Sequence, residues 1–180
     1  MSVQTKDKKS GRQANIEKKA AEKAAKSGAL TALTADRHEL YQHSVQNVEA
    51  EIDFIDAEFE SIRGRKAQSL REDFCGTGNT SVEWIKRRKT NTAVGLDIDQ
   101  PTLDWGDEHH LAKLSDDERS RVQLLNRTVL EPGDAGGTDC VLAMNFSYWL
   151  FKTRDELRGY FKSVRDSIGK DGIFFLDHYG

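Results

Sequence analysis

The feature that most constrains the fold of this chain is the alternation, after Gly64, of short apolar runs with longer segments of helical spacing. Short apolar runs bounded by turn residues are typical of buried strands. Strands that alternate with helices predict βαβ units and therefore a parallel sheet covered by helices, a doubly wound α/β fold. We expect the strands near residues 68–74, 92–98, 121–129, 139–145 and 173–177.

Signals for the start and end of helices lie between the expected strands. Residues 80–83 (TSVE) and 153–156 (TRDE) have the pattern of a capping box, in which a threonine hydroxyl and a glutamate satisfy free backbone amides. Pro101 suits the first turn of a helix. The last helix should end in a left-handed residue at Gly169.

Three regions are expected along the chain. Residues 1–30 are rich in Lys and Ala and poor in large apolar residues, which predicts a disordered tail. Residues 31–64 have the spacing of one amphipathic helix or of two joined helices. Residues 65–180 form the α/β domain, and because the sequence ends directly after the fifth expected strand, we expect its sheet to be C-terminally truncated.

Charge is distributed unevenly, although the net charge is only −3. Residues 1–30 carry eight basic and three acidic residues, a net of +5, which leaves −8 for the remainder. An acidic body argues against nucleic-acid binding, apart from weak contact through the basic tail. No apolar run resembles a membrane span or signal peptide, and Cys75 and Cys140 are expected to be free thiols, so we expect a cytoplasmic protein.

A glycine-containing turn, Cys75-Gly76-Thr77-Gly78, lies between the first expected strand and the following helix. Such a turn lets backbone amides approach a ligand at the positive end of the helix. The three-glycine dinucleotide fingerprint would need a glycine where Ser81 stands, so a nicotinamide oxidoreductase fits poorly.

A carboxylate, Asp97, ends the second expected strand 25 residues after Glu72. An acidic side chain at this tip can accept hydrogen bonds from both hydroxyls of a ribose. A helix cap is the alternative, since Asp97 or Asp99 precedes the helix that opens near Pro101. We predict ribose binding for Asp97 and capping for Asp99.

The segments LREDFCGTG (residues 70–78) and VGLDID (residues 94–99) resemble the first two motifs of class I S-adenosylmethionine-dependent methyltransferases. The resemblance covers roughly residues 36–180 and is greatest to an uncharacterised branch of that family. Members of that branch share the run LREDFCGT and also the segments NFSY (residues 145–148), FKTR (151–154) and FFLD (174–177).

The resemblance implies S-adenosyl-L-methionine as cofactor. Glu72 would be the acidic residue of the first motif, Gly76 and Gly78 would line the methionine part, Asp97 would hold the ribose and Ile98 would pack on adenine. Two positions depart from the family pattern: Phe74 replaces the first glycine, and Thr128 stands where a carboxylate often meets the adenine amino group. The predicted cofactor residues are Glu72, Cys75, Gly76, Thr77, Gly78, Asp97, Ile98, Thr128, Val129 and Asn145.

The segment after the fourth expected strand lies at the sheet edge where open α/β folds bind ligands. Asn145 and Tyr148 are the candidates for positioning the methyl acceptor. We expect the aromatic rings at residues 146, 149 and 151 to pack rather than stack on a base, and His178 to be structural rather than a general base. Tyr41 has two interpretations, helix packing and a contact over the cofactor carboxylate.

Three consecutive charges, Arg71, Glu72 and Asp73, fall in a strand that should be partly buried, so each needs a partner. Two interpretations are open: the charges meet the cofactor, or Arg71 forms an internal ion pair with a neighbouring acid. A metal site at His109 and His110 is not expected, since adjacent residues point to different faces of a helix.

These patterns predict transfer of the sulfonium methyl of S-adenosylmethionine to an unidentified oxygen, nitrogen or carbon acceptor, in the cytoplasm. Such transfer depends on proximity and orientation, so no catalytic triad is expected. The alternative is a catalytically inactive or truncated cofactor-binding module. The acceptor and the oligomeric state do not follow from the sequence.

Overall fold

A computed structural model describes Lys19 and residues 35–178 of the chain, and the predicted tail, residues 1–30, lies outside the described part except for Lys19. The chain divides into two compact units, residues 1–46 and 47–180. Helix α2 (Arg37–Val45), which carries Tyr41, belongs to the first unit. Among the described helices, none is long and apolar enough to cross a membrane.

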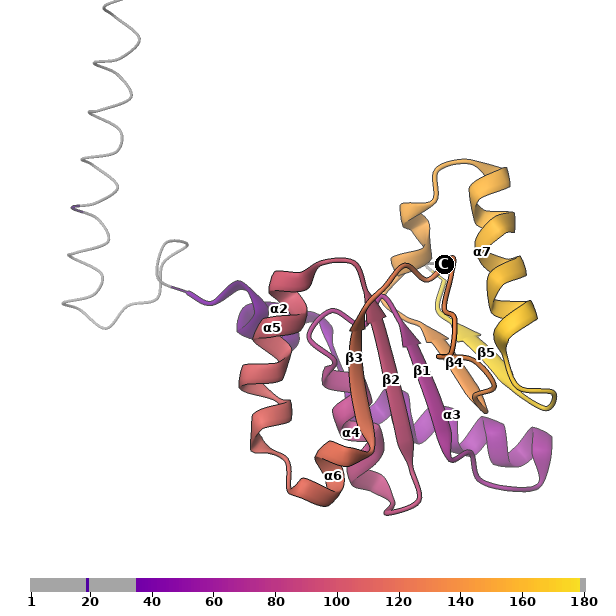
Figure 1. The fold of residues 1–180 in the computed structure, drawn as a ribbon, viewed down its shortest axis with the longest axis horizontal. Coiled ribbons are helices and arrows are strands. Elements are labelled where there is room, and N and C mark those ends of the chain that lie inside the picture. The colour runs from indigo at the N-terminus through magenta and orange to yellow at the C-terminus, as the bar shows by residue number, and fades with distance from the viewer. Residues whose placement is uncertain (1–18, 20–34, 179–180) are drawn as a thin grey trace, which may run out of the picture. The chain divides into compact units, whose positions relative to one another are not determined.

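The second unit holds a five-stranded parallel sheet in the order β3-β2-β1-β4-β5, with β1 at its centre (Figure 1). This is the doubly wound arrangement that the alternating pattern predicts. The strands are β1 (Ser69–Asp73), β2 (Thr92–Asp97), β3 (Val122–Asn126), β4 (Cys140–Ala143) and β5 (Ile173–Leu176). The helices are α3 (Val48–Arg63), α4 (Asn79–Arg87), α5 (Gln100–His109), η1 (Leu111–Lys113), α6 (Asp116–Ser120), η2 (Ser147–Leu150) and α7 (Arg154–Ser167).

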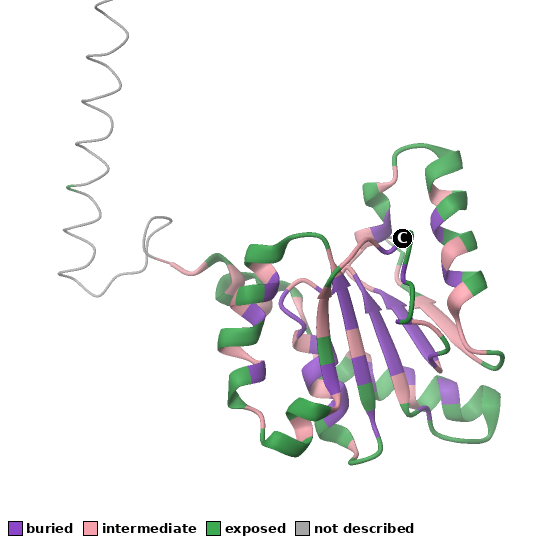
Figure 2. Ribbon diagram, viewed as in Figure 1, coloured by how far each residue is buried: buried purple, intermediate pink, exposed green. Residues whose placement is uncertain are grey.

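Each face of the sheet has its own apolar core. Helices α3 and α4 pack on one face around Ile55, Trp84 and Leu142, while α7 packs on the other around Val141 and Tyr160. Helices α5 and α6 contact the sheet at β3, and Figure 1 shows them beside this edge strand. The central strands are accordingly the most deeply buried part of the unit, and the helices are exposed on their outer sides (Figure 2).

The expected strands are all present, each somewhat shorter than predicted. The capping box at residues 153–156 is confirmed, since Thr153 and Glu156 make both of its hydrogen bonds. Pro101 lies in the first turn of α5, as expected. Gly64 ends α3 in the left-handed conformation, with φ of 68°.

The predicted left-handed stop at Gly169 is wrong. Helix α7 ends at Ser167, its C-cap Ile168 is extended, and Gly169 has no positive φ. Glycine is needed there for a different reason: an added Cβ would lie 2.8 Å from the carbonyl oxygen of Thr138, which accepts a hydrogen bond from the Gly169 amide. Close approach of two backbone segments therefore selects this residue.

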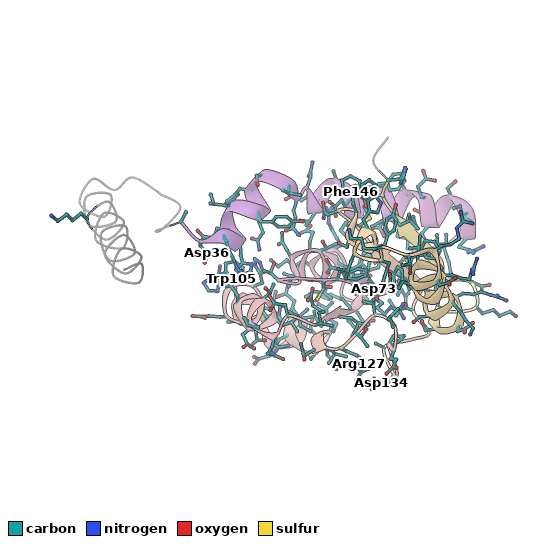
Figure 3. All side chains as sticks on the ribbon, turned by 90° about the horizontal axis from the view of Figure 1, so that it is seen from above. Asp36, Asp73, Trp105, Arg127, Asp134 and Phe146 are labelled. Carbon is teal, nitrogen blue, oxygen red and sulfur yellow. The ribbon has the colours of Figure 1, made fainter. Side chains whose placement is uncertain are left out.

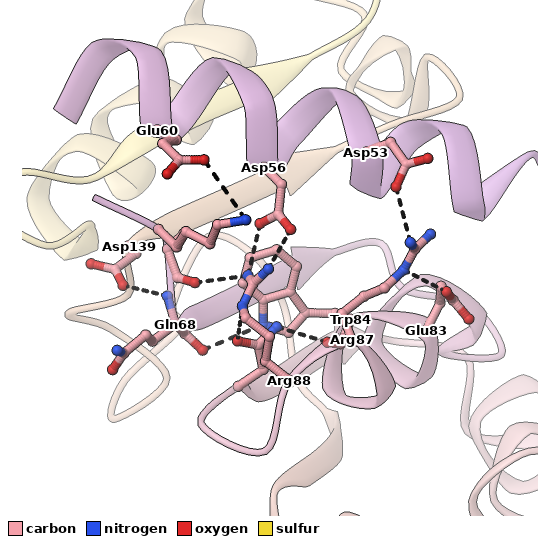
Figure 4. A network of polar contacts seen from close by, with 12 residues as sticks. Asp53, Asp56, Glu60, Gln68, Glu83, Trp84, Arg87, Arg88 and Asp139 are labelled. Atoms are coloured by element: carbon pink, nitrogen blue, oxygen red, sulfur yellow. Dashed lines mark hydrogen bonds and ion pairs between the residues drawn. The ribbon is translucent and has the colours of Figure 1, made fainter. Parts of the chain in front are cut away.

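A polar network joins α3 to the end of α4 at the amino edge of the sheet (Figure 4). The Arg88 guanidinium forms a two-pronged ion pair with Asp56 and donates to the carbonyl of Ala67. It also lies over the Trp84 ring, 5.3 Å from the ring centroid. Arg87 pairs with Asp53 and Glu83. The basic end of α4 is thus tied to α3 rather than simply solvated.

The internal ion pair, one of the two interpretations for the charges of β1, is present. Arg71 Nε lies 2.9 Å from Asp73 Oδ1, and both side chains are 0% exposed. Arg71 also donates to the Ser167 hydroxyl at 2.7 Å, and the Tyr160 hydroxyl donates to Asp73 at 2.9 Å. Because residues i and i+2 of a strand share a face, Arg71 and Asp73 both point under α7.

Removing one member of this pair should destabilise the protein strongly, because the other charge would remain buried without a counter-ion. We expect Arg71→Met to lower the free energy of unfolding by about 3–5 kcal/mol. Adding Asp73→Leu should recover part of that loss, since the stranded carboxylate is then removed. Urea denaturation measures both changes.

Arg158→Met is the matched control, because Arg158 pairs with Asp155 on the surface, where the side chains are 70% and 90% exposed. We expect this control to cost under about 1 kcal/mol. Equal effects of the two arginine substitutions would show that burial of the Arg71 pair is unimportant.

Candidate functional site

The candidate site begins with the turn that follows β1, residues 74–78. Three of its residues have left-handed backbones, with φ of 59° at Phe74, 54° at Gly76 and 71° at Gly78. The turn is joined to β2 by the Cys75 amide, which donates to the carbonyl of Leu96 at 3.0 Å. It therefore lies at the carboxyl ends of β1 and β2, the edge at which open α/β sheets bind ligands.

Phe74 takes the backbone conformation that the missing first glycine would favour. A left-handed conformation is uncommon for a bulky residue and costs about 1–2 kcal/mol. Its ring offsets this cost by packing edge-on against Phe151 and Tyr160, with centroid separations of 6.1 and 5.5 Å. The substitution of phenylalanine for glycine thus preserves the turn and anchors it to the core under α7.

Asp97, at the tip of β2, is bonded directly to the turn. One carboxylate oxygen accepts from the Gly76 amide at 2.8 Å, and the other accepts from the Asp99 amide at 2.9 Å. An ionised carboxylate has about four acceptor positions, so about two remain for a ligand. The backbone thus orients Asp97 without using up its capacity to bind hydroxyl groups.

Asp99 occupies the N-cap position of α5, but its side chain makes no capping bond to a backbone amide. The carboxylate instead accepts from the Thr102 hydroxyl, one turn into the helix. The prediction of capping is therefore correct in position and wrong in the bond. Of the two amides that a cap would use, that of Pro101 has no hydrogen, and that of Thr102 donates to the Asp99 carbonyl instead.

Glu72 points to the face of the sheet opposite Arg71 and Asp73. The side chain is only 8% exposed, and one oxygen accepts from the Ser81 amide at 2.9 Å and from the Ser81 hydroxyl at 2.6 Å. Burial raises the pKa of Glu72 to about 7, despite the lowering effect of hydrogen bonds from Ser81 and Thr80. Glu72 therefore ties β1 to the first turn of α4.

This contact corrects the capping box predicted at residues 80–83. Helix α4 begins at Asn79 with Gly78 as N-cap, so Thr80 lies inside the helix, and Glu83 pairs with Arg87. The carboxylate of Glu72, nine residues earlier on β1, accepts from the Ser81 amide in place of a cap within the helix. The N-cap residue is Gly78, which has no side chain that could form a cap.

Two glycines allow the turn to pack closely against its neighbours. A Cβ at Gly106 would lie 2.2 Å from the carbonyl oxygen of Thr77, and one at Gly95 would lie 2.7 Å from the sulfur of Cys75. Cys75 is buried, and its burial raises the pKa of the thiol well above the usual range. Both cysteines are free, as predicted, and Cys75 acts as a packing residue beneath the turn.

The side of the site beyond β2 contains the residues predicted to contact adenine. Ile98, a large apolar side chain directly after β2, is 69% exposed. Thr128 uses its hydroxyl to accept from the Leu130 amide at 3.3 Å, and Val129 is buried in the core. Asn126, which the sequence did not single out, pairs in register with Asp97 and donates to its carbonyl at 3.4 Å.

The loop after β3 also carries an ion pair between Arg127 and Asp134, and Figure 3 shows these side chains next to each other. Arg127 donates to the carbonyl of Pro132 at 2.7 Å as well. These contacts brace the loop that contains Thr128 and Val129. Both predicted residues thus lie on a structured segment beside the tip of β2.

On the other side of β1, the segment after β4 forms a second turn. Asn145 and Phe146 both have φ of 56°, and their amides donate to the carboxylate of Asp177, just beyond β5. Tyr148 is buried, and its hydroxyl lies 2.9 Å from the carbonyl oxygen of Asp177 and 3.2 Å from Nδ1 of His178. The Tyr148 hydroxyl is therefore engaged by the end of β5.

The aromatic residues of this segment differ in environment. Phe151 packs against Phe74 and Tyr160, which agrees with the prediction that it packs rather than stacks on a base. Phe146 tilts against Trp149 at 5.4 Å, and Trp149, which also contacts the His178 ring, is 44% exposed. The exposed aromatic surface at this end of the site is therefore provided mainly by Trp149.

Taken together, the predicted residues form two groups at one edge of the sheet. The first turn joins Glu72, Cys75, Gly76, Thr77 and Gly78 to Asp97, and the second turn holds Asn145 and Tyr148. The groups flank β1, which pairs with β2 on one side and β4 on the other. Within residues 35–178, no three His, Cys, Asp or Glu side chains are arranged to hold a metal ion.

No protein-family model matches the sequence, and no curated protein matches it. Solved structures match the fold. The glycopeptide N-methyltransferase MtfA, complexed with (S)-adenosyl-L-methionine, is 20% identical with a TM-score of 0.56, over 68% of this chain and 52% of that chain. CalS10, an S-adenosylmethionine-bound amino pentose methyltransferase from Micromonospora echinaspora, is 16% identical with a TM-score of 0.65, over 84% and 59%.

An S-adenosylmethionine-dependent methyltransferase from Clostridium acetobutylicum is 17% identical with a TM-score of 0.63, over 77% of this chain and 55% of that chain. The described α/β unit therefore has the Rossmann-like fold of these methyltransferases. This chain spans little more than half the length of each of the three solved structures.

The raised pKa of Glu72 makes a prediction about stability and pH. The pKa is about 7 in the folded protein and 4.5 in the reference state, so the folded state binds the proton more tightly. This group therefore contributes stability that is fully present below pH 4.5 and is lost as the pH rises through 7. Between pH 5 and 8 we expect wild type to lose about 2–3 kcal/mol relative to Glu72→Gln.

Urea denaturation of both proteins across this pH range measures the difference. Glutamine keeps an oxygen that can accept from Ser81 but carries no charge, so other titrating groups cancel in the comparison. If the unfolding free energies of the two proteins changed in parallel with pH, the raised pKa of Glu72 would be contradicted.

Gly106→Ala tests the close approach of α5 to the turn. Alanine is favoured over glycine inside a helix by about 1 kcal/mol, so helix propensity alone predicts stabilisation. We expect the opposite, a loss of about 1–3 kcal/mol in unfolding free energy, because the new methyl group meets the Thr77 carbonyl. Thermal or urea unfolding gives the sign.

Gly159→Ala in α7 is the matched control, since a Cβ there has no neighbouring atom within 4 Å. We expect this substitution to stabilise the protein by about 0.5–1 kcal/mol. If both alanines stabilise the protein, α5 does not pack against the turn as the structure shows.

Proposed function

We propose that this chain is an S-adenosylmethionine-dependent methyltransferase that binds the cofactor across the tips of β2, β1 and β4. The observation that carries the proposal is the hydrogen bond between the Asp97 carboxylate and the Gly76 amide, at 2.8 Å. It places a carboxylate with about two free acceptor positions directly beside a turn whose backbone a ligand can approach.

The ribose and adenine bind on the β2 side in this proposal. Asp97 accepts from the two ribose hydroxyls, which an ionised carboxylate does better than a neutral group. The exposed side chain of Ile98 covers one face of the adenine ring, and its burial by the ligand would remove apolar surface from water. Asn126 and Thr128 supply polar groups near the rim, in place of the carboxylate that the family often has.

The methionine part of the cofactor lies over the turn after β1. Gly76 leaves this stretch without a side chain, and Gly78, where an added Cβ would lie 2.6 Å from the Leu124 side chain, lets the turn pack close to β3. Helix α4 begins directly behind the turn. The start of a helix carries partial positive charge, which suits the cofactor carboxylate. Glu72 supports the turn from below through Ser81 rather than by touching the ligand.

The methyl group then points toward the turn after β4, because a ligand that starts at Asp97 and crosses β1 reaches that strand next. The bound cofactor supplies an electrophilic methyl, and the protein holds the acceptor in line with it. Asn145 is the stronger of the two positioning candidates, since the hydroxyl of Tyr148 is bonded to the end of β5. His178 shares that bond, which favours a structural role.

Three further observations support the proposal without extending it to an acceptor. The three solved structures named above are methyltransferases, and MtfA and CalS10 have S-adenosylmethionine bound. The motif LREDFCGTG resembles the first motif of the uncharacterised branch, and membership of that branch stays a prediction. A cytoplasmic location stays a prediction.

Isothermal titration of S-adenosylhomocysteine tests the proposal before an acceptor is known. We expect saturable binding by wild type and at least a tenfold weaker affinity for Asp97→Ala, a difference of about 1.4 kcal/mol. Asp104→Ala, on the exposed side of α5, is the control and should bind like wild type. A folded wild-type sample that does not bind would refute the proposal.

A methyl-transfer assay with labelled cofactor and a panel of amines, alcohols and peptides distinguishes an active enzyme from an inactive cofactor-binding module. Binding that depends on Asp97 without turnover on any acceptor would favour the module.

A further inference from the structure

The turn after β4 has two consecutive residues, Asn145 and Phe146, in the left-handed region at φ of 56°. Asparagine tolerates this region better than most residues, whereas phenylalanine is seldom found there. Two such residues in sequence persist only when the surrounding structure holds them. A group outside the turn must therefore hold these two residues in place.

The carboxylate of Asp177 supplies it. One oxygen accepts from the Asn145 amide at 3.0 Å and the other accepts from the Phe146 amide at 2.9 Å. Two successive amides that point at one anion are the arrangement that a left-handed turn produces, and ionised acceptors make the stronger hydrogen bonds. Asp177 thus receives both donors of the turn at once.

The main chain of Asp177 holds the same segment at a second point. Its carbonyl accepts from the Tyr148 hydroxyl at 2.9 Å, and Tyr148 lies in η2, which follows the turn. The next residue, His178, contacts Trp149 with its ring at 5.8 Å. Four contacts therefore fasten residues 177–178, just beyond β5, to residues 145–149, from which they lie 29–32 positions away in the sequence.

We propose that Asp177 is a positioning residue for methyl transfer, which holds the turn at Asn145 and Phe146 so that Asn145 meets the methyl end of the cofactor. This inference rests on the proposed function. Its physical basis is that the cofactor's ribose end is anchored by Asp97 at β2, whereas the methyl end meets a turn whose shape depends on Asp177. The two carboxylates therefore set the two ends of the ligand site separately.

This separation gives a test that needs no acceptor. In sinefungin a carbon replaces the sulfonium sulfur and carries an amino group in place of the methyl, whereas S-adenosylhomocysteine keeps the sulfur and lacks the methyl. The ratio of the two affinities thus reports on the methyl end alone. We expect Asp177→Ala to change this ratio by at least about fivefold while the affinity for S-adenosylhomocysteine stays within about twofold of wild type.

Asp177→Asn keeps one accepting oxygen and should give an intermediate ratio. If Asp177→Ala does not fold, the same comparison of affinities can be made with Asp177→Asn. Asp155→Ala removes an exposed aspartate at the start of α7 and should leave both affinities unchanged. Equal changes in both affinities, or no change in either, would overturn the positioning role, because a general loss of structure does not discriminate between the ligands.

Amide hydrogen exchange at Asn145 and Phe146 tests the restraint independently of any ligand. We expect at least about tenfold faster exchange at these two amides in Asp177→Ala, with amides in β1 and β2 unchanged. Unchanged exchange at both would overturn the inference. If wild type binds neither ligand, the positioning role fails together with the proposed function, whereas the exchange result still decides whether Asp177 restrains the turn.

Discussion

The structure depends on how the three consecutive charges of β1 are satisfied at the centre of the sheet. Arg71 and Asp73 point under α7 and pair with each other, while Glu72 points the opposite way and binds the first turn of α4. An unpaired charge in this position would cost several kcal/mol. Each helical layer is therefore fixed to the central strand by a polar contact as well as by its apolar core, and the turn that follows β1 inherits its position from both.

Much of this architecture follows from the sequence. The alternating apolar runs predicted the parallel sheet, and the position of Asp97 after the second run predicted a carboxylate beside the glycine-containing turn. These features are local or periodic, so they leave a pattern in the chain. The capping box at Thr153 is of the same kind, because its two partners lie three residues apart.

The features that the sequence did not predict depend on residues from other elements of the fold. The N-cap of α4 is Gly78, which has no side chain, and the amide of Ser81 is satisfied by Glu72, nine residues earlier on β1. The turn at Asn145 is held by Asp177, 32 residues away. Gly169 was predicted to end a helix by its backbone conformation, but Thr138 selects it through close approach. In each case a partner from another strand or loop replaced the local one, and no local pattern records that choice.

Phe74 shows how the two halves of the site are connected. Asp97 links β2 to the first turn, and Asp177 links β5 to the second, so neither carboxylate spans the site. Phe74 belongs to the first turn, and its ring packs on Phe151, which directly follows η2 in the second segment. A glycine at this position would adopt the same backbone without strain but would lack that contact. With phenylalanine instead of glycine at position 74, the backbone is more strained. The ring, however, makes a direct apolar contact between the segments proposed to hold the cofactor and the acceptor.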